Sequence, residues 1–157
     1  MKEIEKFLKE LEEINKEIIE ILNMAPSILE KKIKNWSIKD AIAHIISWKR
    51  EILEIMKKTQ EGKFKWNYFL KTQKDIDEWN EREINKRKNF SALELKEELE
   101  KVSNELILFL KTLDEKMLKK EFEPPWEGKT TIFECIEAQI EHSREHLEKI
   151  KKLKLYD

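Results

Sequence analysis

Glycine and proline are scarce in this sequence, which has only two glycines and three prolines among its 157 residues. A sandwich or barrel of many short strands needs many tight turns, and those turns depend on glycine and proline. The scarcity of both residues therefore argues against such folds. Lysine, glutamate, leucine and isoleucine dominate instead, as they do in long helices. The composition predicts an all-α protein.

Cysteine, long apolar runs and net charge are also nearly absent. The single Cys135 cannot form an internal disulfide, which favours a reducing cytoplasm. No stretch approaches the ~20 apolar residues that span a bilayer, and the acidic, amphipathic start MKEIEKFLKELEE is unlike a signal peptide. The 32 basic and 33 acidic side chains are interspersed, so no basic face is expected. We expect a soluble cytoplasmic protein with neither a membrane nor a nucleic-acid partner.

Four segments carry apolar residues at the three- and four-residue spacing of an amphipathic helix, over residues 4–21, 38–56, 92–113 and 132–150. In the first segment the stripe has the spacing found in helical bundles. Each segment is long enough to cross one small domain. The pattern predicts four helices that pack by their apolar stripes.

The ends of these helices are also marked in the sequence. Pro26 ends the first helix. The other three begin after Ser37, Ser91 and Thr131. Ser37 and Ser91 each have an acidic residue three positions later, as in a capping box, and residues 131–134 cap the fourth helix. The hydroxyl-bearing residues therefore set three helix starts.

The second and third helices are joined by a long connection. It contains an irregular stretch, residues 59–74, and a short helix over residues 75–86. Residues 122–128 contain two prolines and are expected to form a loop. We predict a single domain, residues 1–157, that folds as an up-down-down-up four-helix bundle with a long crossover containing the extra helix.

The chain has three histidines, and their positions suggest a metal site. His142 and His146 are four residues apart, so both rings project from one face of the fourth helix. His44 lies at the edge of the apolar stripe of the second helix, where it could meet them in a cleft. Three neutral imidazoles suit one divalent transition metal such as Zn, Ni or Fe and leave coordination positions open. The alternative is that all three are ordinary core-edge histidines.

Two residues near the histidines have competing interpretations. Asp40 is one turn before His44, so it could orient that ring or act as a general base. It is also the acidic residue of the capping box that begins at Ser37, and this role is favoured. Cys135 lies two turns before His142, about 10 Å away by helix rise, and is interpreted as a buried, inert thiol.

Five tryptophans are many for this length and could line an apolar substrate cleft near the metal. Trp48 is one turn after His44 and is the best candidate for a pocket wall, and Trp79 is a second candidate. Trp36 and Trp126 precede helix starts, so they could equally well fix the chain to the core. Trp66 lies in the irregular stretch.

Three segments together resemble the DinB/YfiT-like superfamily, and most closely its ClbS/DfsB branch. Residues 36–48 are similar to the W-S-x-x-D-x-x-A-H-x-x-x-W run of that branch. Residues 77–82 resemble its D-x-x-N element, and residues 126–130 resemble its W-x-G-x-x loop. His142 and His146 then match its histidines in the last helix. The order and spacing of these segments agree over almost the whole chain.

The resemblance implies an up-down bundle with a crossover, often dimeric. It also implies that His44, His142 and His146 hold the metal, and that Asn80 belongs to the substrate pocket. Some relatives are thiol-dependent transferases or isomerases, and ClbS-like relatives hydrolyse an electrophilic cyclopropane. Arg144 lies between the paired histidines, where many relatives of the branch have a tyrosine after the first one, so the resemblance does not name a substrate.

Three hypotheses for function remain open. The leading one is a metal-dependent hydrolase or thiol-dependent transferase that acts on a small electrophilic molecule in stress defence or detoxification. The second is a non-catalytic bundle that binds a small hydrophobic ligand in a tryptophan-lined cleft. The third is an interaction bundle that forms a homodimer through an exposed apolar edge.

Overall fold

The computed structural model describes residues 2–62 and 66–153, and within them the chain is helical apart from short connections and two small ladders. The helices are α1 (Lys2–Leu22), α2 (Pro26–Leu29), α3 (Ile38–Gln60), α4 (Gln73–Lys86), α5 (Ala92–Lys111), α6 (Glu115–Lys119) and α7 (Ile132–Lys151). The strands are β1 (Lys32–Ile33), β2 (Trp36–Ser37), β3 (Glu121–Phe122) and β4 (Thr130–Thr131). Among the described helices, none is long and apolar enough to cross a membrane.

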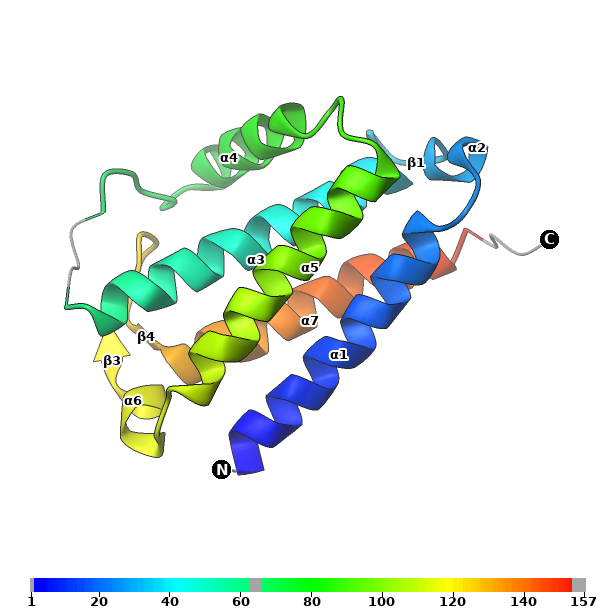
Figure 1. The fold of residues 1–157 in the computed structure, drawn as a ribbon. Coiled ribbons are helices and arrows are strands. Elements are labelled where there is room, and N and C mark those ends of the chain that lie inside the picture. Colours follow the sequence, from blue (N-terminus) through cyan, green and yellow to red (C-terminus); the bar gives the residue numbers. More distant parts are fainter. Residues whose placement is uncertain (1, 63–65, 154–157) are drawn as a thin grey trace.

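The four long helices α1, α3, α5 and α7 form the predicted bundle. Helices α1 and α7 run in one direction and α3 and α5 in the other, which is the up-down-down-up arrangement (Figure 1). Helix α1 packs against α5 and α7, and α3 packs against the same two helices. The predicted fold class is therefore confirmed.

The core is formed by the apolar stripes that the sequence predicted. In α1, the stripe from Ile4 to Ile21 is buried at every step of three or four residues. Ile42 and Ile45 of α3 and Leu99 and Val102 of α5 are completely buried. Each such side chain stabilises the fold by about 1.5–3 kcal/mol relative to an exposed position. Packing of these faces, rather than helix propensity, holds the bundle together.

The predicted helix starts are confirmed by side-chain caps. Ser37 Oγ accepts a hydrogen bond from Asp40 N at 3.0 Å, and Ser91 caps α5 in the same way. Thr131 Oγ1 caps α7. The crossover helix α4 begins at Gln73, two residues before the predicted start, because Thr72 and Asp75 form a further capping box.

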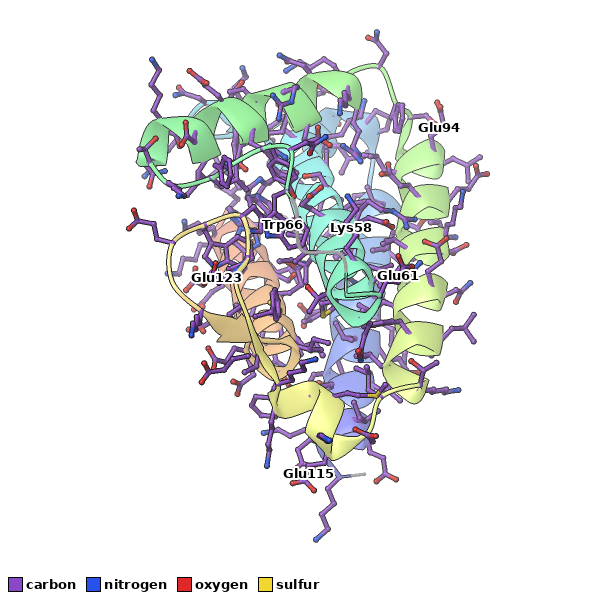
Figure 2. All side chains as sticks on the ribbon, turned by 90° about the vertical axis from the view of Figure 1, so that its left-hand side faces the viewer. Lys58, Glu61, Trp66, Glu94, Glu115 and Glu123 are labelled. Atoms are coloured by element: carbon purple, nitrogen blue, oxygen red, sulfur yellow. The ribbon has the colours of Figure 1, made fainter. Side chains whose placement is uncertain are left out.

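The crossover lies across one side of the bundle, with α4 against α3 (Figure 1). Of the irregular stretch predicted at 59–74, residues 63–65 lie outside the described part of the chain. Trp66 Nε1 donates to the carbonyl oxygen of Glu123 at 2.8 Å, and both residues are labelled on the near face in Figure 2. Leu70 N donates to Pro125 O at 2.9 Å. These bonds join the crossover to the predicted loop 122–128.

Several features of the fold were not predicted, including helix α6 and the β3–β4 ladder, which brings Phe122 of the predicted loop into a strand. Pro26 ends α1 as expected but also begins α2, because proline is tolerated at the first position of a helix. Residues 32–37 form a hairpin in which Ile33 pairs with Trp36 across a two-residue turn. Lys34 in this turn has a φ of 59°, a left-handed conformation that side-chain-bearing residues rarely adopt. The hairpin places Trp36 directly before α3.

Candidate metal centre

The three histidines come together between α3 and α7. His44 Nε2 lies 3.0 Å from His142 Nε2, and His146 Nε2 lies 3.2 Å from the same atom. One ligand atom from each residue lies within 4.8 Å of the other two. The helix-face argument from sequence therefore predicted their convergence correctly.

Hydrogen bonding alone does not account for this arrangement. A neutral imidazole nitrogen either carries one hydrogen or offers one in-plane lone pair, so His142 Nε2 makes one good hydrogen bond. It nevertheless has two imidazole nitrogens at contact distance. A cation shared by the three lone pairs would satisfy all of them at once, so the donor set fits a metal ion.

Two of the three separations fit a single ion as well. Two nitrogens bound at about 2.0–2.1 Å to one ion are roughly 2.9 Å apart at a right angle and roughly 3.4 Å apart at the tetrahedral angle. The separations from His142 to its two neighbours, 3.0 and 3.2 Å, fall within that range. The ligand atoms of the third pair, His44 and His146, lie within 4.8 Å of each other.

The surroundings keep the imidazoles neutral, which is the form that ligates metals. Burial, together with the neighbouring His142 and His146, lowers the pKa of His44 to about 2. Burial also lowers the pKa of His146 to about 4, and it lowers the pKa of His142. At neutral pH, all three rings therefore keep a lone pair for a ligand bond.

Trp36 lies closer to the histidines than the sequence indicated. Its ring centroid is 4.7 Å from that of His44 and 6.3 Å from that of His146. The hairpin of residues 32–37 holds the indole there, and Trp36 Nε1 donates to Glu81 Oε1 at 3.2 Å. In the sequence, only its position just before a helix start suggested a special role for Trp36. A tryptophan at such a position can equally well fix the chain to the core, so the sequence did not assign it to the site.

Helix α4 covers the site by packing against a second indole, that of Trp48 on α3. Trp48 Nε1 donates to Asn80 Oδ1 at 2.8 Å. The Trp48 ring lies 4.3 Å from the ring of Trp79 and 6.5 Å from that of His142, measured between centroids. Trp48 thus stands between the histidines and α4, at the position predicted for a pocket wall.

Asp40 is engaged in the cap rather than with His44. Its carboxylate accepts from Ser37 N at 3.2 Å, and Lys88 Nζ lies 3.5 Å from it. His44 Nδ1 is buried and has no hydrogen-bond partner among the described residues. The geometry therefore favours the capping role of Asp40.

A cavity of about 620 Å³ adjoins the three histidines, and most of its described lining is apolar or aromatic. Trp36, Trp48 and Trp126 contribute indole rings, and Asn80 contributes a polar group. Trp79 is buried behind Trp48 and is not among the described lining residues. The remaining described lining residues are Ile52, Leu70, Ile76, Thr130, Glu134, Cys135, Ala138 and Gln139.

Cys135, near the start of α7, is buried and lines one end of this cavity. Burial raises the pKa of its thiol to about 11, so the thiol is protonated at neutral pH. A protonated thiol is a weak nucleophile and a poor metal ligand. The structure is consistent with the predicted inert role, although sequence alone did not place Cys135 in the cavity wall.

Comparisons with solved structures show where this fold occurs. A Clostridium difficile 630 protein of uncharacterised function has 17% sequence identity and a TM-score of 0.79, with 96% of this chain and 95% of that chain covered. DfsB, described as a sibling lethal factor precursor, has 13% identity and a TM-score of 0.78, with 96% and 94% covered. The colibactin self-resistance protein ClbS, solved in complex with dsDNA, has 13% identity and a TM-score of 0.77, also with 96% and 94% covered. At these identities the likeness establishes the fold alone.

The family comparison covers nearly the whole bundle. The model of the DinB superfamily matches residues 4–150, a range that includes all three histidines and the crossover helix. The comparison with curated proteins gave no match. The resemblance predicted from the sequence motifs is thus confirmed, and the chain belongs to the DinB superfamily.

Proposed function

We propose that this protein is a metal-dependent enzyme, a hydrolase or a thiol-dependent transferase, that acts on a small electrophilic molecule in stress defence or detoxification. The observation that carries the proposal is the convergence of three neutral imidazoles beside an aromatic cavity of about 620 Å³. A cavity of this size with a few polar groups is typical of a small-molecule site.

In this proposal, His44, His142 and His146 hold one divalent ion, with Zn, Ni or Fe as the expected candidates. Such an ion would supply Lewis-acid chemistry, which polarises a bound substrate or lowers the pKa of a nucleophile. Because His142 Nε2 has both other histidines at contact distance, it is the central ligand of the set.

The other residues of the cavity bind and orient the substrate. The indole faces of Trp36 and Trp48 adjoin the histidines, and they exclude water from an apolar substrate bound there. Because Trp48 Nε1 fixes Asn80 Oδ1, the amide NH₂ of Asn80 is the group expected to donate to the substrate. Asp40 is assigned no catalytic step.

The direct test is elemental analysis of purified, untagged protein alongside His142→Ala and the matched control Glu141→Ala. Glu141 precedes His142 on α7 and is exposed. We expect about one equivalent of a transition metal in the wild type and in the control, and loss of that metal in His142→Ala. Metal retained by His142→Ala, or absent from the wild type after reloading and dialysis, would refute the metal site.

Catalysis is tested on the metal-loaded protein with panels of epoxides, activated esters and other small electrophiles, with and without added thiol. Turnover that disappears in both His44→Ala and His142→Ala supports the enzyme. If the protein binds these electrophiles or forms covalent adducts with them but does not turn them over, the enzyme hypothesis fails.

The aromatic cavity also favours a second candidate function, non-catalytic binding of a small hydrophobic ligand. Three indoles line this cavity, and this is sufficient for binding without chemistry. This alternative predicts ligand-induced quenching of tryptophan fluorescence that survives removal of metal by a chelator. The enzyme hypothesis predicts that chelation abolishes both turnover and metal-dependent affinity.

Small molecules are the partners that we propose, with a homodimer as the assembly and the cytoplasm as the location. ClbS was solved with dsDNA, whereas this chain has a net charge of −1 with interspersed charges. Binding to a labelled duplex at low salt tests the nucleic-acid question directly. Light scattering after size-exclusion chromatography tests the dimer.

A further inference from the structure

A second pocket, of about 480 Å³, adjoins the metal centre and shares Trp36, Asn80 and His146 with the aromatic cavity. Four elements form its walls: the hairpin of residues 32–37, helix α4, the second half of α7 and, through Ala41, the start of α3. The other described lining residues are Ile33, Lys34, Asn35, Ala41, Asp77, Glu81 and Lys149. Both pockets therefore border the histidine cluster, the second one at His146.

The charges of this pocket are sorted by wall. Helix α4 contributes two carboxylates, Asp77 and Glu81, whereas the hairpin and α7 contribute two ammonium groups, Lys34 and Lys149. Within residues 2–62 and 66–153, no ion pair joins these two lysines to these two carboxylates. Charges of both signs therefore face the same space without neutralising each other.

Each acidic group is held by a neighbour that leaves its charge intact. Glu81 Oε1 accepts from Trp36 Nε1 at 3.2 Å, and Asp77 Oδ1 accepts from Gln73 Nε2 at 2.9 Å. Both donors are neutral, so the two carboxylates keep their negative charge for a cationic group. These contacts also orient the carboxylates before any ligand arrives.

The two lysines on the opposite wall are also held in place. Lys34 adopts a left-handed conformation in the turn next to Trp36, which is unfavourable for a residue with a side chain. Glycine would occupy this turn without that cost, but it would contribute no charge to the pocket. Lys149 is close enough to the centre for its charge to lower the pKa values of His142 and His146.

We propose that this pocket binds a small zwitterion of the α-amino acid or short-peptide class as a second ligand beside the metal centre. The ligand carboxylate pairs with Lys34 and Lys149, and the ligand ammonium pairs with Asp77 and Glu81. A ligand with only one charge would satisfy one wall and be repelled by the other. The assignment of this ligand as a second substrate rests on the proposed function, whereas the binding itself does not.

The test compares three ligands of nearly equal size by calorimetry: L-leucine, N-acetyl-L-leucine and L-leucine amide. At neutral pH the first is a zwitterion, the second an anion and the third a cation. Each charged end of leucine meets two exposed charges of the pocket, and such contacts are individually weak, so we expect L-leucine to bind about 2- to 30-fold more tightly than either derivative. The titrations are performed on metal-loaded protein and repeated after chelation, because leucine could also bind the ion directly.

Variants connect the binding to the pocket. Lys149→Gln and Asp77→Asn should each weaken leucine binding about three- to fivefold, whereas Lys152→Gln, a charge change at the exposed end of the same helix region, should not. Equal binding of all three ligands, no binding of leucine up to about 10 mM, or equal affinities in Lys149→Gln and Lys152→Gln would overturn the proposal. If the protein holds metal but gives any of these results, the zwitterion pocket is wrong and the proposed metal-dependent function is unaffected. If leucine binds in the expected pattern but the protein holds no metal, the proposed function is wrong and the zwitterion pocket stands.

Discussion

His44 Nε2 and His142 Nε2 lie 3.0 Å apart although 98 positions separate the two residues in the chain. Two neutral imidazole rings at this distance share at most one hydrogen bond, and His146 offers a third nitrogen to the same point. The cluster is therefore best satisfied by a bound cation, which gives the first prediction.

Divalent transition metals should raise the thermal stability of the metal-free protein. An ion that binds only the folded state stabilises it by about 2.7 kcal/mol when its free concentration is 100 times the Kd. Differential scanning calorimetry with Zn²⁺, Ni²⁺ and a chelator measures the shift in Tm. His142→Ala should remove the shift and Glu141→Ala should retain it, and an equal shift in both variants would place the ion elsewhere.

Asn80→Ala should loosen helix α4 without unfolding the bundle. The substitution removes the acceptor for Trp48 Nε1, a hydrogen bond worth about 1 kcal/mol. Hydrogen exchange of the α4 amides should accelerate about fivefold, while the amides of α1 and α5 stay protected. Asn85→Ala, at an exposed position on the same helix, is the control. Unchanged exchange in Asn80→Ala would show that the bond does not hold α4 in place.

Lys34→Gly should be more stable than Lys34→Ala. Both variants lose the lysine charge, but only glycine adopts a φ of 59° without a clash at Cβ. The expected difference in free energy of unfolding is about 1 kcal/mol, measured by urea denaturation. At Asn35 the corresponding pair should show no such advantage for glycine, because that residue does not have a positive φ. If the two Lys34 variants were equally stable, the turn would not impose this conformation in solution.

Lys49 should make stability depend on alkaline pH. Its side chain is 1% exposed, and Lys49 Nζ donates to Asn15 Oδ1 at 2.7 Å. Burial lowers the pKa from 10.5 to about 8, so between these values the unfolded chain binds more protons than the folded protein. Stability therefore rises as the pH increases from about 8 to 10.5, and it is insensitive to this group below that window.

The size of this effect follows from the same two values and amounts to about 3 kcal/mol across the window. Urea denaturation of the wild type and of Lys49→Met at several pH values measures it. The difference in stability between the two proteins should shift in favour of the wild type as the pH rises. A difference that does not change with pH would mean that Lys49 is protonated and solvated in the folded protein.

The long helices and the histidine cluster could be predicted because both depend on periodicity. Apolar spacing sets the buried face of α1, and the four-residue spacing of His142 and His146 places both rings on one side of α7. The caps at Ser37 and Ser91 depend on local hydrogen bonds that a short sequence window contains. Such features need no knowledge of distant segments.

Other features depend on contacts between distant segments, and the sequence does not reveal them. The hairpin before α3 has a lysine where a two-residue turn usually has glycine or asparagine, so it lacks the usual turn signature. Trp36 could therefore not be placed against His44 in advance. Lys49 is buried because Asn15 of α1 contacts its ammonium group, and Asn15 in turn donates to Ser103 of α5. No pattern within α3 indicates those partners.

Helix α4 reaches the site as a separate part of the crossover, and among the described elements α3 is its principal packing partner. Beside the histidines it is held by two indole N–H groups, one donating to Asn80 and one to Glu81. The helix also buries Trp79 and Ile84, and Arg87 at its end binds Glu98 of α5. Lid-like elements of this kind open on a timescale of roughly microseconds to milliseconds. Residues of α4 line both pockets, so an opening of α4 would expose both pockets to solvent and would couple the residence times of any ligands bound in them.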